Sequence, residues 1–149
     1  MKRIFVTLAL AVAVVSVSFA SDVVKVDRKI QAAFQKEFAS AFNPTWEELT
    51  DGLYHVSFSQ NGEAMDAYYN EQGQQVALAR SVSKDNLPLL VGRTIDQKFR
   101  GSIVTDIREV VGENETSYLV TARNEKATTI ARIYTGGGIE IVKKVKNGK

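Results

Sequence analysis

The sequence predicts an α+β fold built as a tandem repeat, in which a helix and a four-stranded antiparallel sheet occur twice and the helices pack on one sheet face. Two segments carry apolar residues at every fourth position, and each is followed by segments in which apolar and polar residues alternate. Short turns rich in Asn and Gly separate the alternating segments. Strands joined by such turns must be antiparallel, and their apolar side needs a covering layer.

Residues 1–20 have the pattern of a signal peptide. A positive start at residues 1–3 precedes an uncharged stretch at residues 4–19. This stretch is shorter than the roughly 20 residues that a helix needs to span a bilayer, which favours a cleaved leader over a membrane anchor. The small residues Ser18 and Ala20 fit a signal peptidase, so we expect cleavage after Ala20.

Composition indicates a bacterial envelope protein. The chain of 149 residues has no Cys, which excludes disulfides and a lipid-modified Cys and is typical of a periplasmic domain. The 19 basic residues include Lys2 and Arg3, whereas all 17 acidic residues follow the leader, so the mature chain has no net charge. Such a chain attracts phosphate backbones and anionic lipid only weakly. We therefore expect a soluble periplasmic or secreted protein that binds neither nucleic acid nor, after signal removal, the membrane.

An internal similarity relates the two halves of the mature chain. Residues match counterparts 65 positions later: Val26 with Val91, Ile30 with Ile95, Phe34 with Phe99, Tyr69 with Tyr134, and Gly73 with Gly138. A fixed spacing of this kind indicates a duplicated unit. It predicts a first helix-plus-sheet repeat at residues 21–84 and a second at residues 85–149, together forming one compact domain.

The first repeat is expected to open with a helix. Four apolar residues would form its buried stripe, with charged residues outside: Val26, Ile30, Phe34 and Phe38. Asp22 is a plausible cap for this helix. Asn43-Pro44 is expected to end it, because proline disfavours helical geometry in the preceding residue and cannot donate to the previous turn.

The second helix is expected to begin near Asp85 or Asn86, with Pro88 in its first turn, and to end at Arg100-Gly101. Asn61-Gly62 predicts a hairpin turn, because both residues tolerate a positive φ. The expected strands are a short segment near Trp46, residues 54–58, 63–69 and 75–81 in the first repeat, and residues 103–111, 117–123, 128–134 and 139–145 in the second. Trp46 itself is assigned to the core.

The sequence offers little material for catalysis or for a cofactor. His55 is the one imidazole of the chain and lies on the polar side of its strand, so a solvent-facing role is favoured over that of a general base. Asp66, Asn70 and Glu71 could supply oxygen ligands but lack the spacing of a calcium loop. Residues 136–138 are three glycines followed by a strand, so no helix N-terminus is present to bind phosphate. We therefore expect no enzyme activity, no cofactor and no metal site.

Several short motifs together resemble a known family. They are the Phe34-x-x-x-Phe38 helix, Asn43-x-x-Trp46, the Asn61-Gly62 hairpin, Ala67-Tyr68-Tyr69-Asn70-x-x-Gly73, and Leu87-Pro88 before the second helix. With the exported leader, this combination resembles the PepSY-like family of beta-lactamase-inhibitor-like proteins, which is typical of Bacteroidetes envelopes. The resemblance covers essentially the whole mature chain.

The resemblance implies a tandem helix-plus-four-strand fold related to beta-lactamase inhibitory protein. Its motifs are those that make the fold and include no catalytic set, so the resemblance supports architecture more than activity. Proteins of the inhibitor type commonly carry disulfides, whereas this chain has no Cys. Inhibition of a beta-lactamase is therefore only an analogy at the level of the fold.

The sheet face away from the helices is the candidate binding surface. We expect it to carry His55, Ser57, Tyr68, Arg80 and Arg132, because aromatic and arginine side chains suit protein contacts. A merely solvated face is the alternative interpretation of these residues. The function hypothesis is a non-enzymatic protein-binding module, such as an inhibitor or modulator of an envelope or secreted enzyme. A periplasmic carrier, with a small molecule or lipid between helices and sheet, is the second hypothesis, and a hydrolase that depends on His55 is the third.

Overall fold

The fold is that of a computed structural model, which describes residues 25–49 and 52–148. Its elements are α1 (Arg28–Glu37), β1 (Phe42–Glu48), β2 (Leu53–Gln60), β3 (Glu63–Asn70), β4 (Gln75–Ser81), the 3-10 helix η2 (Lys84–Asn86), α2 (Leu89–Lys98), β5 (Ile103–Gly112), β6 (Thr116–Arg123), β7 (Ala127–Tyr134) and β8 (Ile139–Lys146). The predicted signal peptide, residues 1–20, lies outside the described residues. None of the helices described is long and apolar enough to cross a lipid bilayer.

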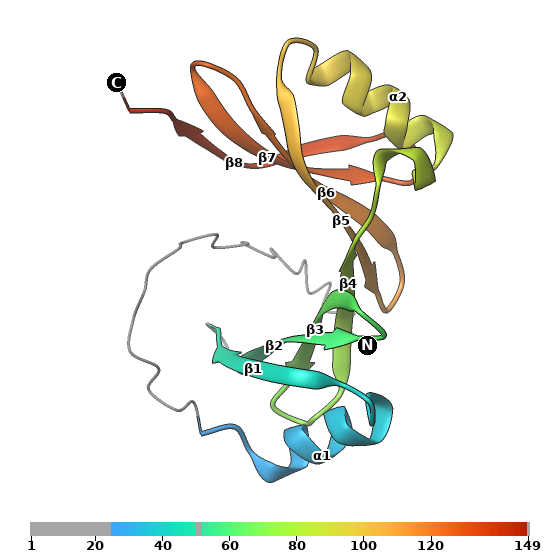
Figure 1. Ribbon diagram of the computed structural model, residues 1–149, viewed down its shortest axis with the longest axis vertical. Helices are drawn as coiled ribbons and strands as arrows, with labels where there is room; N and C mark the ends of the chain where they lie inside the picture. Colours follow the sequence, from blue (N-terminus) through green and yellow to red (C-terminus); the bar gives the residue numbers. More distant parts are fainter. Residues whose placement is uncertain (1–24, 50–51, 149) are drawn as a thin grey trace, which may run out of the picture.

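The strands form one antiparallel sheet in which their spatial order is their order in the chain, from β1 to β8 (Figure 1). Between β4 and β5 the chain leaves the sheet to form η2 and α2. The two strands nevertheless pair directly, from Ala77 opposite Gly112 to Ser81 opposite Arg108. The sheet is therefore continuous across the whole molecule.

The predicted tandem repeat of a helix plus a four-stranded sheet is wrong. The described residues form one eight-stranded sheet with two α-helices, because β4 pairs with β5. Two separate sheets would leave the backbone N–H and C=O groups of both strands unpaired along two additional edges. The predicted boundary between residues 84 and 85 falls inside η2 (Lys84–Asn86), and the division into two units stays a prediction.

Both helices contact the same face of this sheet, as the strand register shows. Val56 belongs to the core cluster under α1 and is opposite Ala67, which is opposite Leu78, which is opposite Val111. Further along the same side of β5, Ile107 belongs to the core cluster under α2. We call this side the helix-bearing face. The sheet curves so that α1 and α2 both lie on its outer side (Figure 1).

The four residues predicted as the buried stripe of the first helix, Val26, Ile30, Phe34 and Phe38, are all buried, but only Ile30 and Phe34 lie within α1. Phe34 lies at the centre of an aromatic group, with its ring centroid 5.0 Å from that of Phe58 and 5.4 Å from that of Trp46. The assignment of Trp46 to the core is likewise confirmed, because this partly buried ring packs against the cluster. Burial of these rings fixes α1 on the sheet.

The ends of the first helix differ from the prediction. Asp27 caps α1, accepting a hydrogen bond of 2.8 Å from the backbone N–H of Lys29, whereas Asp22 lies outside the described residues. Asn43 and Pro44 do not end the helix but lie in β1, where the register shifts between Phe42 and Thr45. Asn43 adopts a φ of 50° there, and the missing N–H of Pro44 is tolerated because β1 is an edge strand.

The second helix begins later than predicted. Lys84–Asn86 form the separate turn η2, and α2 starts at Leu89 with Pro88 as its N-cap. Leu87 is extended, with a ψ of 148°, because the residue before a proline avoids helical geometry. Gly101, with a φ of 78°, follows the end of α2 and turns the chain into β5.

Candidate functional site: the concave face

The sheet face opposite the helices is concave, because the sheet curves around it (Figure 1). We call it the concave face. Its centre is a small apolar cluster of Tyr68, Ala77, Ala79, Val110 and Leu119. In β4 the side chains that alternate with Leu78 must point to this face, so Ala77 and Ala79 form its floor.

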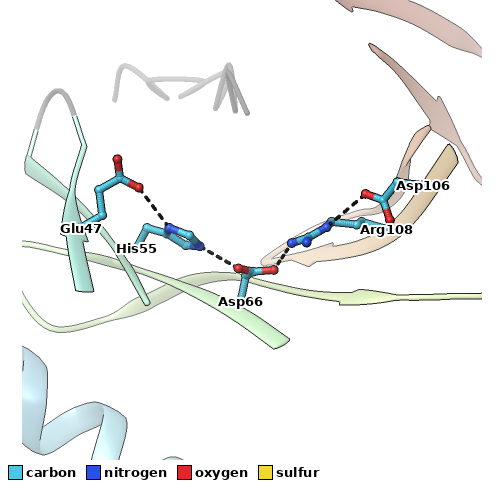
Figure 2. Close-up of polar contacts among 5 residues, drawn as sticks. All are labelled: Glu47, His55, Asp66, Asp106 and Arg108. Atoms are coloured by element: carbon cyan, nitrogen blue, oxygen red, sulfur yellow. Dashed lines mark hydrogen bonds and ion pairs between the residues drawn. The ribbon is translucent and has the colours of Figure 1, made fainter. Parts of the chain in front are cut away.

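A chain of charged side chains crosses the concave face next to this cluster (Figure 2). His55 of β2 lies between two carboxylates. Its Nε2 donates a hydrogen bond of 2.8 Å to Oδ1 of Asp66 on β3, and its Nδ1 lies 3.5 Å from Oε2 of Glu47 on β1. Glu47 is opposite His55 in the register, so neighbouring strands place these two side chains side by side.

Asp66 extends the chain of contacts to β5, which is not a neighbour of its own strand. Its second oxygen, Oδ2, accepts a hydrogen bond from Nη1 of Arg108. The Arg108 Nε then donates to Oδ2 of Asp106 at 3.3 Å. Ala79 lies opposite Asp66 on β4, and Ser81 lies opposite Arg108. These small side chains leave the long guanidinium room to reach across β4 and link the first half of the sheet to the second.

We call Glu47, His55, Asp66, Asp106 and Arg108 the charged network. Its central carboxylate is desolvated, since the Asp66 side chain is only 10% exposed, whereas the terminal side chains of Glu47 and Asp106 are 65% and 44% exposed. A buried carboxylate is costly unless it is paired, and here two donors from different strands pair it. The network therefore presents its two free ends, both carboxylates, to the solvent.

The contacts of His55 bear on its predicted role. Each of its ring nitrogens faces a carboxylate, so neither is directed at a hydroxyl that it could deprotonate. Within the described part of the chain, no group of three or more His, Cys, Asp or Glu side chains is arranged to hold a metal ion. The arrangement holds ionisable side chains at fixed positions on a curved surface.

Tyr68 stacks on His55, with ring centroids 4.8 Å apart and planes inclined by 20°. The side chain is buried, and burial together with the nearby charge of Asp66 raises the pKa of Tyr68 to about 12. The positive charge of Arg108 opposes this shift but does not cancel it. The neutral phenol is thus the form that fits the folded protein.

This shift predicts an alkaline loss of stability that involves Tyr68. In the unfolded chain the phenol ionises near pH 10, so the folded protein retains a proton that the unfolded chain loses between about pH 10 and 12. The contribution of the Tyr68 phenol to the free energy of unfolding is therefore complete below about pH 10 and is lost as pH rises. Between about pH 9 and 11, the native chain should lose about 1.4 kcal/mol more stability than Tyr68→Phe. Urea unfolding of both proteins at the two pH values measures this difference, and parallel losses would contradict it.

The predicted binding residues separate between the two faces. His55, Ser57 and Tyr68 lie together on the concave face of β2 and β3. Arg132 of β7 lies on the same face further along, opposite Leu119 of the concave cluster. Arg80, in contrast, is on the helix-bearing face, because it alternates with Ala79. It donates a hydrogen bond of 2.8 Å to Glu109, which also accepts one from the hydroxyl of Tyr118.

Sequence reasoning missed most of the charged network. Glu47, Asp106 and Arg108 were not candidates, and Asp66 was considered only as an oxygen ligand. One signal was available for Asp66, since a single carboxylate in the otherwise apolar stretch at residues 64–69 of a strand needs a partner. Its partners come from strands β2 and β5, and no sequence pattern identifies them.

Comparisons with known proteins place the fold. No protein-family model matches the sequence, and no curated protein matches it. Solved structures do: a proposed periplasmic protein of Bacteroides eggerthii has a TM-score of 0.70 at 14% identity, covering 81% of this chain and 88% of that one. A DUF2874 family protein of Bacteroides uniformis has a TM-score of 0.68 at 19% identity, covering 80% and 88%.

A BLIP-like protein of Bacteroides fragilis has a TM-score of 0.66 at 20% identity, covering 89% of this chain and 92% of that one. At such identities the likeness concerns the fold alone. It agrees with the relation to the fold of beta-lactamase inhibitory protein that the resemblance in the sequence implies, whereas no comparison bears on the PepSY-like family. The chain therefore shares its fold with a BLIP-like protein and with DUF2874 family proteins of Bacteroides.

Proposed function

We propose that this chain is an exported, non-enzymatic protein that binds a protein partner through its concave face. The charged network is the observation that carries the proposal. Burying the Asp66 carboxylate between His55 and Arg108 costs desolvation free energy, and packing of the sheet does not require a charge at this position. Fixed charges on a curved surface do, however, give electrostatic complementarity to a partner. The stacked ring of Tyr68 adds the aromatic character that is common at protein interfaces.

Export is supported by the leader pattern at residues 1–20 and by the absence of Cys. A similar fold in a proposed periplasmic protein of Bacteroides eggerthii is in keeping with this location. We place the mature chain in the periplasm or outside the cell. Membership of the PepSY-like family remains a prediction from the motifs.

The partner we propose is an envelope or secreted enzyme that the chain inhibits or modulates. The shared fold with a BLIP-like protein supports this choice only by analogy, because function is a property of sites and not of folds. The described part of the chain contains cavities of about 290 and 390 Å³, and neither of these is lined by a residue of α1 or α2. Neither cavity therefore offers the carrier hypothesis a ligand site between helices and sheet.

Site-specific photo-crosslinking tests the proposal. A photoreactive amino acid at Ser57 on the concave face should capture a discrete envelope protein in living cells. The matched position is Lys36, which is exposed on α1 on the other side of the sheet, and there the same amino acid should capture none. Equal capture at both positions, or none at Ser57, would refute binding through the concave face. Native mass spectrometry of the purified protein distinguishes the carrier hypothesis from the protein-binding proposal, because only a carrier retains a bound small molecule or lipid.

A further inference from the structure

The concave face contains a hollow at its C-terminal end. The cavity of about 390 Å³ is lined by residues of β5 to β8, among them Thr121, Ile130, Lys143 and Val145. The register places these side chains on the concave face: Thr121 alternates with Val120 and lies opposite Ile130, which lies opposite Lys143. Asp106 lines the same cavity, so the hollow begins where the charged network ends.

The cavity has an apolar floor that is partly exposed. Ile130 and Val145 supply this floor, and threonine side chains from β5, β6 and β7 supply part of its wall. Val145 is 49% exposed although it points into a hollow of the sheet and not outward. An apolar side chain inserted here would remove this surface from water, which is the contribution that anchor residues make at interfaces.

The two charged side chains that line the cavity, Asp106 and Lys143, differ in their contacts. Asp106 is already paired with Arg108, whose Nε lies 3.3 Å from its Oδ2. Lys143 makes no ion pair with any residue in the described ranges of the chain. Among the described residues no carboxylate pairs with this ammonium group, so a carboxylate of a partner can pair with it.

We propose that this cavity is the anchor site of the concave face, which takes one Leu or Phe side chain of a partner protein while a neighbouring Asp or Glu of that partner pairs with Lys143. The proposal rests on the proposed function and specifies the chemistry of the partner. Pockets for complete small ligands measure about 300 to 1,000 Å³. The cavity of about 390 Å³ lies near the lower end of this range and has room for one large apolar side chain.

A peptide selection tests the anchor site. A random dodecapeptide library displayed on phage is selected on the mature chain, from residue 21 onward. The enriched peptides should carry Leu or Phe within two positions of Asp or Glu. Their affinity should fall about tenfold in Lys143→Glu, because attraction becomes repulsion, and also in Val145→Asp, which places a charge in the apolar floor. Selection on the Lys143→Glu protein should instead enrich Lys or Arg beside the apolar residue.

The matched control is Lys144→Glu. Lys144 is the next residue of β8 and points to the other side of the sheet, so the same change of charge should leave peptide affinity unaltered. Circular dichroism of each variant shows that it is folded, so that a loss of affinity reports on the site itself.

Three results would refute the anchor site: no enrichment of the apolar–acidic pattern, equal loss of affinity in Lys143→Glu and Lys144→Glu, or an unchanged affinity in Lys143→Glu. Peptides that depend on Glu47 or Arg108 but not on Lys143 would refute it while leaving the proposed function intact. Absence of crosslinking at Ser57 would refute the proposed function itself.

Discussion

Replacing Phe34 with alanine is expected to lower the free energy of unfolding by about 3 to 5 kcal/mol. The Phe34 side chain is 3% exposed, and its ring has four aromatic neighbours: Phe38, Trp46, Phe58 and Tyr69. These neighbours are attached to α1 and to three strands of the sheet, so they cannot close on the cavity that alanine would leave. Urea titration followed by circular dichroism measures the loss, and emission of Trp46, the one Trp of the chain, reports the local change.

Phe42→Ala is the matched control for this prediction. The residue is the same, but at the start of β1 it is 67% exposed and contributes little buried area. Its replacement should change the free energy of unfolding by less than about 0.5 kcal/mol. If the two variants were equally destabilised, the aromatic group around Phe34 would not be the centre of the core.

Local chemistry explains why most elements could be predicted from the sequence. Val56 and Phe58 alternate with polar residues and are buried, as the alternation in β2 requires. Asn61 and Gly62 turn the chain with φ values of 53° and 83°, which few other residue pairs would adopt. Each of these signals lies within a few residues, so no knowledge of distant contacts was needed.

Pairing between distant segments is what the sequence could not provide. β4 and β5 pair although a helix separates them in the sequence. No pattern in the apolar residues of either strand identifies the other as its neighbour. The face of Arg80 was also ambiguous, since residues 76–79 of its strand are apolar on both sides. In a strand of this composition, alternation alone does not show which side carries the helices.

The charged network was beyond sequence reasoning for the same cause. His55 could be singled out because it is the one His of the chain, but its partners lie in the two adjacent strands. Arg108 is further away still, because it contacts Asp66 across the whole width of β4. The curvature of the sheet and the small side chains of Ala79 and Ser81 allow that pair to meet, and these features come together only in the complete fold.

Arg108→Ala is expected to lower the free energy of unfolding by about 2 to 3 kcal/mol. Removing one partner of a buried ion pair costs about 3 to 5 kcal/mol, and the 36% exposure of the Arg108 side chain reduces this cost. Asp66 would keep its hydrogen bond to His55 but would lose the guanidinium that balances its charge. As a control, Lys84→Ala removes an ion pair of 2.5 Å to Asp96 that is exposed on both sides, and should cost less than about 0.5 kcal/mol.

A double-mutant cycle with Asp66→Asn isolates the contact between the two halves of the sheet. Once the carboxylate is neutral, Arg108→Ala should cost much less than it does in the native chain, giving a coupling energy of about 1 to 2 kcal/mol. Additive effects would mean that Arg108 stabilises the fold by packing its alkyl chain and not by pairing with Asp66. The same cycle, repeated with binding of a captured partner as the readout, separates the two uses of the network. A coupling energy that is found in stability but not in binding would mean that Asp66 and Arg108 only stabilise the curved sheet. A coupling energy that is found in both would place the two residues at the binding interface as well.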